Sequence, residues 1–489
     1  MSPNRTYTLL IDGQLVAARS GKTFDTYNPT TGQVLAPVPE GGLDDAEAVV
    51  AAARGAFDEG PWSRMGGRER AKILRKIAQA IDARATQIAR IETMNSGKTI
   101  RDATQQIHKS ALCFDYYAGL TDKIWGQTIP LEGEMFAYTT RDPVGVCLGI
   151  TPWNSPFIMA TYKTAPALAA GNTVILKPAS ATPLTAMILG EICAEAGLPP
   201  GVMNVITGPG ATTGMALVKH PGVDKVALTG DNSTGSVIMA AAAATAKKVT
   251  LELGGKSPNL VFPDADLDRA VPGSAGAIFS HAGQRCTARS RLLVHERVYD
   301  EFVARFVDVA RNIRIGDPLS VKTQMGPVIS RGQQQSILGY IKSGRESGAT
   351  MLCGDEPLPA ELSGGYYVRP TAFANVDPKS TIAQEEIFGP VVCILKFRDE
   401  SEAIRIANDS VYGLAGTIWT RDIARGHRVA KALRAGVVSI NSVPVTYIEA
   451  PFGGFKRSGI GRELGAEGLD LFTETKTVYV DIADRESKK

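Results

Sequence analysis

The sequence predicts an α/β fold with two alternating strand–helix series, and two β-rich segments lie outside both series. Short apolar segments alternate with helical patterns from Val144 to the end of a strand at residue 253, and a second series runs to about residue 455. Such alternation specifies parallel sheets covered by helices, with right-handed crossovers. Residues 125–140 and 472–480 are rich in β-formers and stand outside both series.

The chain before the first series predicts strands, turns and then helices. Residues 7–38 predict short strands and turns, and Asp44 is placed as the N-cap of a helix over 45–57. Isoleucines at helical spacing predict one long helix over 68–94, which Ser96-Gly97 ends. A third helix is expected over 102–120.

The first series predicts a parallel sheet, and Gly254-Gly255 is interpreted as a hinge before the second series. In the first series we expect strands over 144–150, 173–176, 202–206, 225–228 and 248–253, and helices over 157–170, 184–196, 212–219 and 234–247. The second series begins with strands over 259–262 and 292–295 and helices over 267–282 and 301–313.

Composition bounds the class of protein. The 489 residues are too many for one ordinary core and predict two or three domains. A hydrophobic content of 44% with 21% charged residues is typical of globular proteins. With 53 basic and 50 acidic residues, the net charge of +3 gives no electrostatic footprint for nucleic acid.

Neither membrane insertion nor an extracellular disulfide scaffold is expected. Residues 1–11 lack the apolar core of a signal peptide, and no segment reaches the apolar length of a membrane span. The six cysteines are scattered without a C-x-x-C pair, and the five histidines do not cluster with them. This pattern argues against a disulfide framework and a zinc site, and it predicts a cytoplasmic protein. Residues 485–489 are expected to form a frayed tail.

One thiol and one carboxylate carry the strongest chemical signal. Cys286 ends the segment Gly283-Gln284-Arg285-Cys286, and Glu252 begins the segment Glu252-Leu253-Gly254-Gly255-Lys256-Ser257-Pro258. A thiol can attack a carbonyl carbon, and a carboxylate can activate the water that releases the resulting thioester. Taken alone, Cys286 could equally be a small buried hydrophobe and Glu252 a solvated side chain.

Glycines after predicted strands suggest a phosphate site. Gly208-Pro209-Gly210 with Gly214, and Gly230 with Gly235, each follow a strand and open a helix, where backbone amides can meet a phosphate. Neither has the G-x-G-x-x-G spacing, so plain turns remain an alternative. Gly255-Lys256-Ser257 matches the end of a P-loop, but Thr250 stands where that motif requires glycine, which argues against a nucleotide triphosphatase.

The segments around Glu252 and Cys286 resemble the two signature segments of the aldehyde dehydrogenase superfamily. Further motifs match in family order between about Asn28 and Val478, namely Thr151-Pro152-Trp153-Asn154, Leu176-Lys177-Pro178-Ala179, Glu385-Glu386-Ile387-Phe388-Gly389-Pro390 and Pro451-Phe452-Gly453-Gly454. The resemblance implies an oxidoreductase that converts an aldehyde to its carboxylic acid with NAD or NADP, through a Cys286 thioester and without a metal.

The resemblance also implies a role for each matching residue. Cys286 is the nucleophile, Glu252 the general base and Asn154 an oxyanion donor, while Lys163 lies near the oxyanion and Glu463 near the base as a secondary proton relay. From the residues alone, Asn154 could be a loop-capping asparagine and the lysine a solvated one. The cofactor-binding set implied by the family is Thr151, Pro152, Trp153, Lys177, Ser180, Gly210, Gly214, Gly230, Gly235, Leu253, Glu386 and Phe388.

Within that set, Gly230 and Gly235 match positions along the pyrophosphate, and Lys177 a position near the ribose. Glu386 and Phe388 match positions at the nicotinamide ribose and ring. His281 also lies near Cys286 in sequence, but the family does not use this position as a base, and a Cys–His couple must be shown by geometry.

The family fold implies a division into three parts. Residues 1–124 and 144–254 are expected to bind NAD(P), 255–455 to carry the catalysis, and 125–143 with 471–489 to form a flap that joins subunits in a homodimer or homotetramer. Arg462 and Glu474 match a pair that supports the subunit contact, or they are surface charges. A CoA-acylating semialdehyde dehydrogenase is the alternative function, against which Glu252 argues, and a non-enzymatic protein with the same fold is a second.

Several residues bear on specificity. The substrate pocket is expected to involve Ser155, Met159, Tyr162, Ser280, Thr287 and the loop 443–447. Arg285 and Arg289 suggest the hypothesis of a semialdehyde that carries a carboxylate. The favoured alternative is that Arg285 points into the structure, because adjacent side chains on a turn diverge. Ser180 stands where NAD-preferring relatives often carry glutamate, which predicts that NADP is accepted. Asp231 after Gly230 should weaken either cofactor unless it points away.

Overall fold

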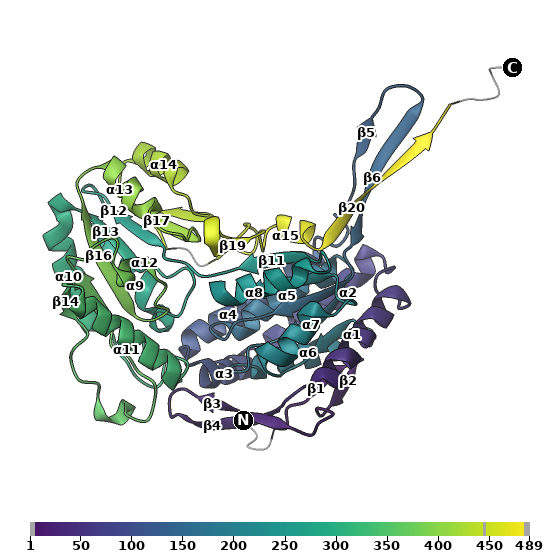
Figure 1. Ribbon diagram of the computed structural model, residues 1–489, viewed down its shortest axis with the longest axis horizontal. Coiled ribbons are helices and arrows are strands. Elements are labelled where there is room, and N and C mark those ends of the chain that lie inside the picture. Colours follow the sequence, from purple (N-terminus) through teal and green to yellow (C-terminus); the bar gives the residue numbers. More distant parts are fainter. Residues whose placement is uncertain (1–4, 444–445, 484–489) are drawn as a thin grey trace.

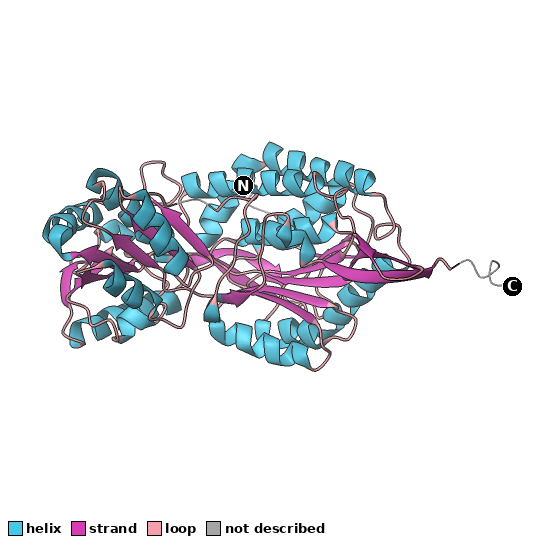
Figure 2. Ribbon diagram, turned by 90° about the horizontal axis from the view of Figure 1, so that it is seen from above, coloured by secondary structure: helices cyan, strands magenta, loops and turns pink. Residues whose placement is uncertain are grey.

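The computed structural model describes residues 5–443 and 446–483, and it confirms the predicted α/β fold. Two large sheets lie side by side in the molecule, and a narrow flap projects from one of them (Figure 1). Seen from above, the strands form a central layer with helices on both faces (Figure 2). Each large sheet has a buried apolar core of its own among its helices.

The first sheet is the predicted parallel sheet, extended by short antiparallel edge strands. Its order is β19 (Gly459–Ile460), β11 (Lys248–Glu252), β10 (Lys225–Thr229), β7 (Val146–Ile150), β8 (Thr173–Lys177), β9 (Met203–Val205), β1 (Leu9–Ile11) and β2 (Gln14–Val16). From β7 the chain adds β8 and β9 on one side, and it then places β10 and β11 on the other. The order of strands therefore reverses between β7 and β10, which is where ligands bind in open α/β sheets.

Helices from the first half of the chain cover this sheet. They are α1 (Leu43–Asp58), α2 (Gly67–Ala83), α3 (Ala85–Ser96), α4 (Ile100–Ala118), α5 (Pro156–Ala169), α6 (Leu184–Glu195), α7 (Met215–Lys219) and α8 (Asn232–Ala243). A hairpin of β3 (Thr23–Asn28) and β4 (Gln33–Pro39) precedes them. Figure 1 shows these helices stacked on the purple-to-teal part of the molecule.

The second sheet is parallel except for one edge strand. Its order is β14 (Thr350–Cys353), β15 (Thr371–Ala374), β16 (Val391–Phe397), β13 (Arg291–His295), β12 (Pro258–Val261), β17 (Ala415–Trp419) and β18 (Val437–Ile440). The covering helices are α9 (Leu267–Phe279), α10 (Tyr299–Arg311), α11 (Arg331–Glu346), α12 (Thr381–Gln384), α13 (Glu400–Asn408) and α14 (Ile423–Ala432). The segment between β11 and β12 joins the two sheets, so Gly254-Gly255 lies at their junction.

The two β-rich segments outside the large sheets pair with each other. β20 (Thr473–Asp481) runs antiparallel to β6 (Met135–Pro143), which also pairs with β5 (Thr128–Pro130). The short helix α15 (Glu467–Asp470) leads into β20. The predicted tail 485–489 lies outside the described residues. Between residues 5–443 and 446–483, no helix combines the length and the apolar composition that a membrane span needs.

The predicted long helix over 68–94 is wrong, because α2 and α3 are separate helices. The chain leaves helical geometry at Arg84, whose φ is −105° and ψ 8°. The isoleucine spacing could not show this break, since Ile77, Ile81, Ile88 and Ile91 are all buried in one core. Gly97 ends α3 in the left-handed conformation, with φ 76°, as predicted.

Three other boundaries are corrected. Gly42, not Asp44, is the N-cap of α1, and the carboxylate of Asp45 accepts a hydrogen bond of 2.9 Å from the Gly42 N–H. A π-helical turn, Gly210–Gly214, replaces the start of the helix predicted over 212–219. The helix predicted over 267–282 ends at Phe279, and His281 and Ala282 then take left-handed φ angles of 51° and 52°.

Candidate active site

The loop that carries Cys286 leaves a left-handed turn and enters β13. Glycine favours such backbone, but His281 and Ala282 adopt it together with Gly283, so the loop start is held in a costly conformation. Cys286 is half-buried, whereas the other five cysteines are buried. A Cβ at position 255 would collide with the Cys286 carbonyl oxygen, so Gly255 permits the close approach of the two segments. Cys286 is therefore the one cysteine that is both ordered and accessible.

Glu252 ends β11 and faces the same region. Its side chain is 3% exposed, and within the described part of the chain neither carboxylate oxygen has a hydrogen-bond partner. A Cβ on Gly453 would lie 2.7 Å from its Oε1, so the motif Pro451–Gly454 packs directly on this carboxylate. Burial and the charge of Glu463 raise the pKa of Glu252 well above its usual range, against the opposing effect of Lys163.

Lys163 and Glu463 lie together in the interior. Lys163 on α5 donates a hydrogen bond to the Glu463 carboxylate and another of 2.8 Å to the Thr229 hydroxyl. Both side chains are buried, with exposed fractions of 0% and 6%. Lys163 and Glu463 therefore form an ion pair close enough to Glu252 for both of their charges to act on its pKa.

Asn154 connects the loop after β7 to the cysteine loop. Its Nδ2 donates a hydrogen bond of 2.9 Å to the backbone carbonyl of Gln284, two residues before Cys286. An amide nitrogen carries two hydrogens, so one N–H remains for a second acceptor. His281, by contrast, is buried, and in the part of the chain that the structure describes neither ring nitrogen is hydrogen-bonded; burial lowers its pKa well below the usual value. A neutral, buried imidazole is not poised as a base for Cys286.

Burial also governs the thiol itself. Burial and the carboxylates of Glu386 and Glu252 raise the pKa of the Cys286 thiol to about 12, while Arg285 opposes them. The resting side chain is therefore a thiol at neutral pH. Formation of the thiolate therefore requires a change around Cys286 that lowers the pKa of its thiol.

Glu386, Phe388 and Trp153 gather at the junction of the two sheets. The Glu386 carboxylate accepts a hydrogen bond of 3.0 Å from the Gly255 N–H, and burial raises its pKa to about 7. The rings of Trp153 and Phe388 meet edge to face, with centroids 5.1 Å apart. Phe388 has a left-handed φ of 52°, which is unusual for a large residue.

The cofactor positions at the end of β8 sit beside one another. Lys177 is 3% exposed and donates one hydrogen bond of 3.2 Å to the Pro178 carbonyl, and burial lowers its pKa to about 8. The Ser180 hydroxyl donates to the Gly208 carbonyl at 3.1 Å. Thr151, at the end of β7, is buried with its hydroxyl unpaired among the described residues, and Pro152 follows it, half-buried.

The predicted glycines lie where β9 and β10 pass into helices. Gly210 begins the π-helical turn and Gly214 ends it against the Lys177 side chain. Gly230 donates its N–H to the Glu252 carbonyl at 3.0 Å. Gly235, in α8, packs on the Leu253 side chain, so that a Cβ there would lie 2.7 Å from Leu253 Cδ2.

Asp231 is the N-cap of α8 and turns toward the helix. Its carboxylate accepts hydrogen bonds from the Thr234 N–H at 2.9 Å, the Thr234 hydroxyl at 2.7 Å and the Ser233 hydroxyl. Partial burial raises the pKa of Asp231, but these hydrogen bonds outweigh it and lower the pKa below the ordinary value. Asp231 thus holds a negative charge at the end of α8 where a phosphate would approach.

An open hollow borders the cysteine loop, and we call it the entrance hollow. The neighbours of Cys286 on both sides line it, and its volume is about 580 Å³ including the open side. Its lining residues are Ala277, Arg285, Thr287, Arg289, Ala415, Val437, Val443, Thr446, Tyr447, Ala450, Pro451 and Phe452. Of the predicted pocket, Thr287, Val443, Thr446 and Tyr447 are among them, and residues 444–445 lie outside the described part of the chain.

The other predicted pocket residues lie away from this lining. Ser280 meets the hollow through Arg285, which donates to its hydroxyl at 2.9 Å. Ser155 accepts a hydrogen bond of 3.2 Å from Lys98. Tyr162 is 3% exposed within α5, and Met159 packs against the core of the first sheet.

Comparison with known proteins agrees with this arrangement. The model of the Aldehyde dehydrogenase family matches residues 15–478. The chain belongs to the aldehyde dehydrogenase family. A mitochondrial aldehyde dehydrogenase of Mesocricetus auratus is 45% identical over 482 residues, covering 98% of this chain and 96% of that protein. A betaine aldehyde dehydrogenase of Bacillus subtilis is 44% identical over 475 residues, covering 96% and 97%.

A solved structure shows the same fold. An aldehyde dehydrogenase from Bacillus cereus in complex with NAD+ superposes with a TM-score of 0.96 and 45% identity, covering 98% of this chain and 97% of that chain. The predicted enzyme class is thereby confirmed. The chain is an aldehyde dehydrogenase, an oxidoreductase that converts an aldehyde to a carboxylic acid with NAD(P)+.

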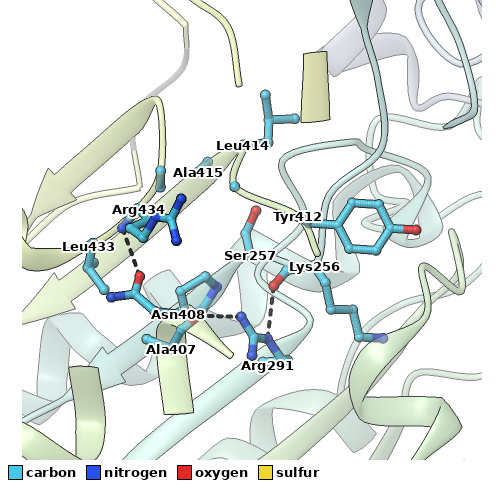
Figure 3. A pocket seen from close by; sticks show the side chains of 13 residues that line it. Lys256, Ser257, Arg291, Ala407, Asn408, Tyr412, Leu414, Ala415, Leu433 and Arg434 are labelled. Atoms are coloured by element: carbon cyan, nitrogen blue, oxygen red, sulfur yellow. Dashed lines mark hydrogen bonds between the residues drawn. The ribbon is translucent and has the colours of Figure 1, made fainter. Parts of the chain in front are cut away.

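In this aldehyde dehydrogenase, the segment that resembles a P-loop end has a structural role. Figure 3 shows Lys256 and Ser257 lining a small hollow with Arg291, Asn408 and Arg434. The Arg291 guanidinium holds this segment by donating to the Lys256 carbonyl at 2.9 Å. Lys256 is 1% exposed, and burial lowers its pKa to about 8. The backbone here is tied to the second sheet and does not cradle a phosphate.

Sequence reasoning missed a buried pair beside the active-site loops. Lys98 is 1% exposed and lies 3.5 Å from the fully buried Glu92, and it also contacts Gln106 and Ser155. Glu92 accepts a hydrogen bond of 2.7 Å from Thr185. No local pattern could have revealed this pair, because a lysine after a helix end is ordinarily solvated.

Proposed function

We propose that this enzyme oxidises its aldehyde through a covalent thioester on Cys286. The Cys286 thiolate attacks the carbonyl carbon, and the carbonyl oxygen becomes an oxyanion. The second N–H of Asn154 and the backbone N–H of Cys286 are the proposed donors to that oxyanion. Their support is the hydrogen bond from Asn154 to Gln284, which fixes the amide beside the cysteine loop.

Glu252 is the proposed base of the second half of the reaction. Water adds to the thioester carbonyl and gives one proton to the Glu252 carboxylate, and the C–S bond then breaks to release the carboxylic acid and the Cys286 thiolate. A raised pKa suits a carboxyl group that must take up a proton near neutral pH. The ion pair of Lys163 and Glu463 is proposed to tune this carboxyl group and to receive its proton.

The residues at the strand-order switch fit a nicotinamide cofactor. The ends of β7 and β10 meet there, the buried Thr151 hydroxyl is unpaired, and Lys177 uses only one N–H on the protein. When bound, the nicotinamide supplies the hydride acceptor. Trp153, Leu253, Glu386 and Phe388 are proposed to hold the nicotinamide end, with Gly210, Gly214, Gly230 and Gly235 toward the phosphates and Ser180 at the adenosine ribose.

The proposed roles are divided between the two sheets and the flap. We assign NAD(P) binding to 1–124 with 144–254, catalysis to 255–455, and subunit contact to 125–143 with 471–489. Edge strand β19 joins the first sheet from beyond these limits. A homodimer or homotetramer and a cytoplasmic location are part of the proposal, the latter supported by six cysteines that are all free.

The observation that carries the proposal is the meeting of an unpaired Glu252 carboxylate with the loop of the half-buried Cys286. The test compares wild type with Cys286→Ala. We expect the variant to lose turnover and to keep cofactor affinity measured by calorimetry, because most of the proposed cofactor residues belong to the first sheet and its helices. Turnover near the wild-type rate in Cys286→Ala would remove the cysteine from the mechanism.

A CoA-acylating reaction is the alternative. It would release the same thioester to a thiol acceptor instead of water, and it needs no general base at Glu252. Wild-type enzyme incubated with aldehyde, cofactor and CoA should yield the free acid. Accumulation of acyl-CoA in its place would favour the alternative.

A further inference from the structure

Arg285 is an unpaired guanidinium on the wall of the entrance hollow. Its Nη1 donates to the Ser280 hydroxyl at 2.9 Å, which fixes the side chain on the hollow. Over residues 5–443 and 446–483, it forms no ion pair with a carboxylate. An arginine has five N–H donors in a planar fork, so donors remain for a carboxylate after the bond to Ser280.

Arg289 is a second cation on the same wall. It is 4% exposed, donates at 2.9 Å to the Thr417 hydroxyl and also to the Thr287 carbonyl, and has no acidic partner among the described residues. Burial and then the charge of Arg285 lower its pKa to about 9. Two arginines that flank the nucleophile therefore face the hollow with hydroxyl and carbonyl partners only. A desolvated cation without a counter-charge is unfavourable.

The charged side chains near Arg285 do not neutralise the two arginines. Lys109 on α4 lies within electrostatic range of Arg285, and only Glu449 is its nearby carboxylate. The charge of Arg285 also lowers the pKa of Lys98, but Lys98 already has the Glu92 carboxylate as an ion-pair partner at 3.5 Å. Pro444 and Val445, outside the described residues, carry no ionisable group. Arg285 and Arg289 are thus the only Lys, Arg, Asp or Glu residues among those that line the entrance hollow in the described part of the chain, so a negative group on the substrate would supply the missing charge.

We infer that this enzyme prefers aldehydes that carry a carboxylate, and that Arg285 binds this carboxylate in the entrance hollow. The inference rests on the proposed function and narrows its substrate class. A guanidinium matches a carboxylate with two parallel hydrogen bonds. A quaternary ammonium aldehyde, such as the one in the name of the Bacillus subtilis relative, would instead meet the like charges of Arg285 and Arg289.

The test measures kcat/KM for two pairs of aldehydes matched in chain length. Succinic semialdehyde is compared with butanal and adipic semialdehyde with hexanal, and betaine aldehyde serves as the cationic probe. Because a hydrogen bond to a charged group contributes tenfold to about a hundredfold in binding, we expect at least one acidic member to exceed its neutral partner by that factor. Betaine aldehyde should be the poorest of the five.

Variants assign the preference to Arg285. Arg285→Met should cost the acidic substrate about a hundredfold, mainly in KM, and the neutral partner far less. Arg285→Lys should restore part of this loss, since it keeps the charge without the fork. Arg305→Met, which removes a surface arginine on α10, is the matched control and should change neither substrate.

Three outcomes would overturn the inference. They are equal kcat/KM for both members of each pair in wild type, equal losses for both members in Arg285→Met, and betaine aldehyde as the best substrate. If none of the five aldehydes is oxidised while Cys286 alkylates normally, the proposed function fails instead. Binding of NAD+ to Arg285→Met, measured by calorimetry, confirms that this variant is folded, and Arg285→Lys provides the same comparison if it is not.

Discussion

Lys163 and Glu463 form a buried ion pair across 300 positions of the chain, and after burial their two charges have the largest effects on the pKa of Glu252. The Glu463 charge raises the pKa of Glu252, and the Lys163 charge lowers it. The candidate base is therefore controlled by two groups that do not hydrogen-bond to it. The helix α5 and the segment after β19 each contribute one of them.

Glu463→Gln should move the acidic limb of turnover to lower pH. The substitution removes the charge that raises the pKa of Glu252 and leaves Lys163, which lowers it, so Glu252 stays ionised in more acidic solution. Since a protonated Glu252 cannot accept a proton from water, kcat should persist to lower pH than in wild type. The pH profile of kcat measures this, with the exposed Glu467→Gln as control.

The Glu463→Gln substitution should also lower the free energy of unfolding, because it breaks the ion pair with Lys163. Leaving a buried Lys163 without Glu463 costs about 3–5 kcal/mol, which denaturant unfolding can detect. An acidic limb that stays in place or moves upward would contradict the coupling between Glu463 and Glu252.

Glu252→Gln should separate the redox step from thioester hydrolysis. The amide cannot take a proton from water, but it leaves Cys286 and the cofactor residues in place. We expect a single-turnover burst of reduced cofactor, followed by a steady-state rate about a hundredfold or more below wild type. Mass spectrometry should detect the acyl group on Cys286. A burst that falls in parallel with the steady state would assign Glu252 to an earlier step.

Alternation of strands and helices made the α/β fold predictable, because the periodicity reports burial directly. The same signal failed at Arg84, where the apolar stripe continues through a break between two helices. It also placed the end of the next helix too late, because the residue types in Ser280-His281-Ala282 do not indicate the left-handed φ angles of His281 and Ala282 that follow Phe279. Tertiary packing, and not local preference, determines the conformation at both places.

The candidate site was predictable where one residue type carries the chemistry. Cys286 and Glu252 could be singled out because their segments resemble two family signatures, and the structure brings those segments together. The partners of Lys163, Lys98 and Arg285 could not be read from the sequence, because each contact joins segments far apart in the chain or depends on a turn.

The flap should hold subunits together. β20 is an edge strand of the three-stranded sheet, and unpaired edges favour association. Phe136, Tyr479 and Val480 are exposed there by 40%, 65% and 39%. Within one chain, Glu474 pairs with Lys248 at 2.6 Å, and Arg462 donates to the Gly454 and Gly461 carbonyls. The predicted support by Arg462 and Glu474 therefore requires a second subunit.

Sedimentation at micromolar concentration should show a dimer or tetramer for wild type. Tyr479→Glu with Phe136→Glu should shift it toward monomer, because charge on this apolar surface opposes burial. The exposed Leu338→Glu on α11 is a matched control and should leave the mass unchanged. A monomeric wild type would contradict the assignment of the flap.

The choice between NAD and NADP should depend on Ser180 and Lys177. A glutamate at position 180 would repel the 2′-phosphate of NADP, whereas the Ser180 hydroxyl donates to the Gly208 carbonyl and adds no negative charge. Lys177, three residues before Ser180, donates one hydrogen bond within the described residues, which leaves two N–H groups for a phosphate. Asp231 is committed to the N-terminus of α8, where its charge weakens both cofactors alike. We therefore expect NADP to be accepted and NAD to remain usable.

Ser180→Glu should raise KM for NADP about tenfold to a hundredfold and KM for NAD far less, since only NADP carries the repelled phosphate. Ala181→Glu places the same charge on the exposed neighbouring side chain and serves as the control. Because burial lowers the pKa of Lys177 to about 8, its charge is present below that pH and is lost above it, so KM for NADP should rise relative to NAD as pH increases through 8. A wild-type enzyme that ignores NADP at pH 7 would show that another side chain closes the phosphate pocket.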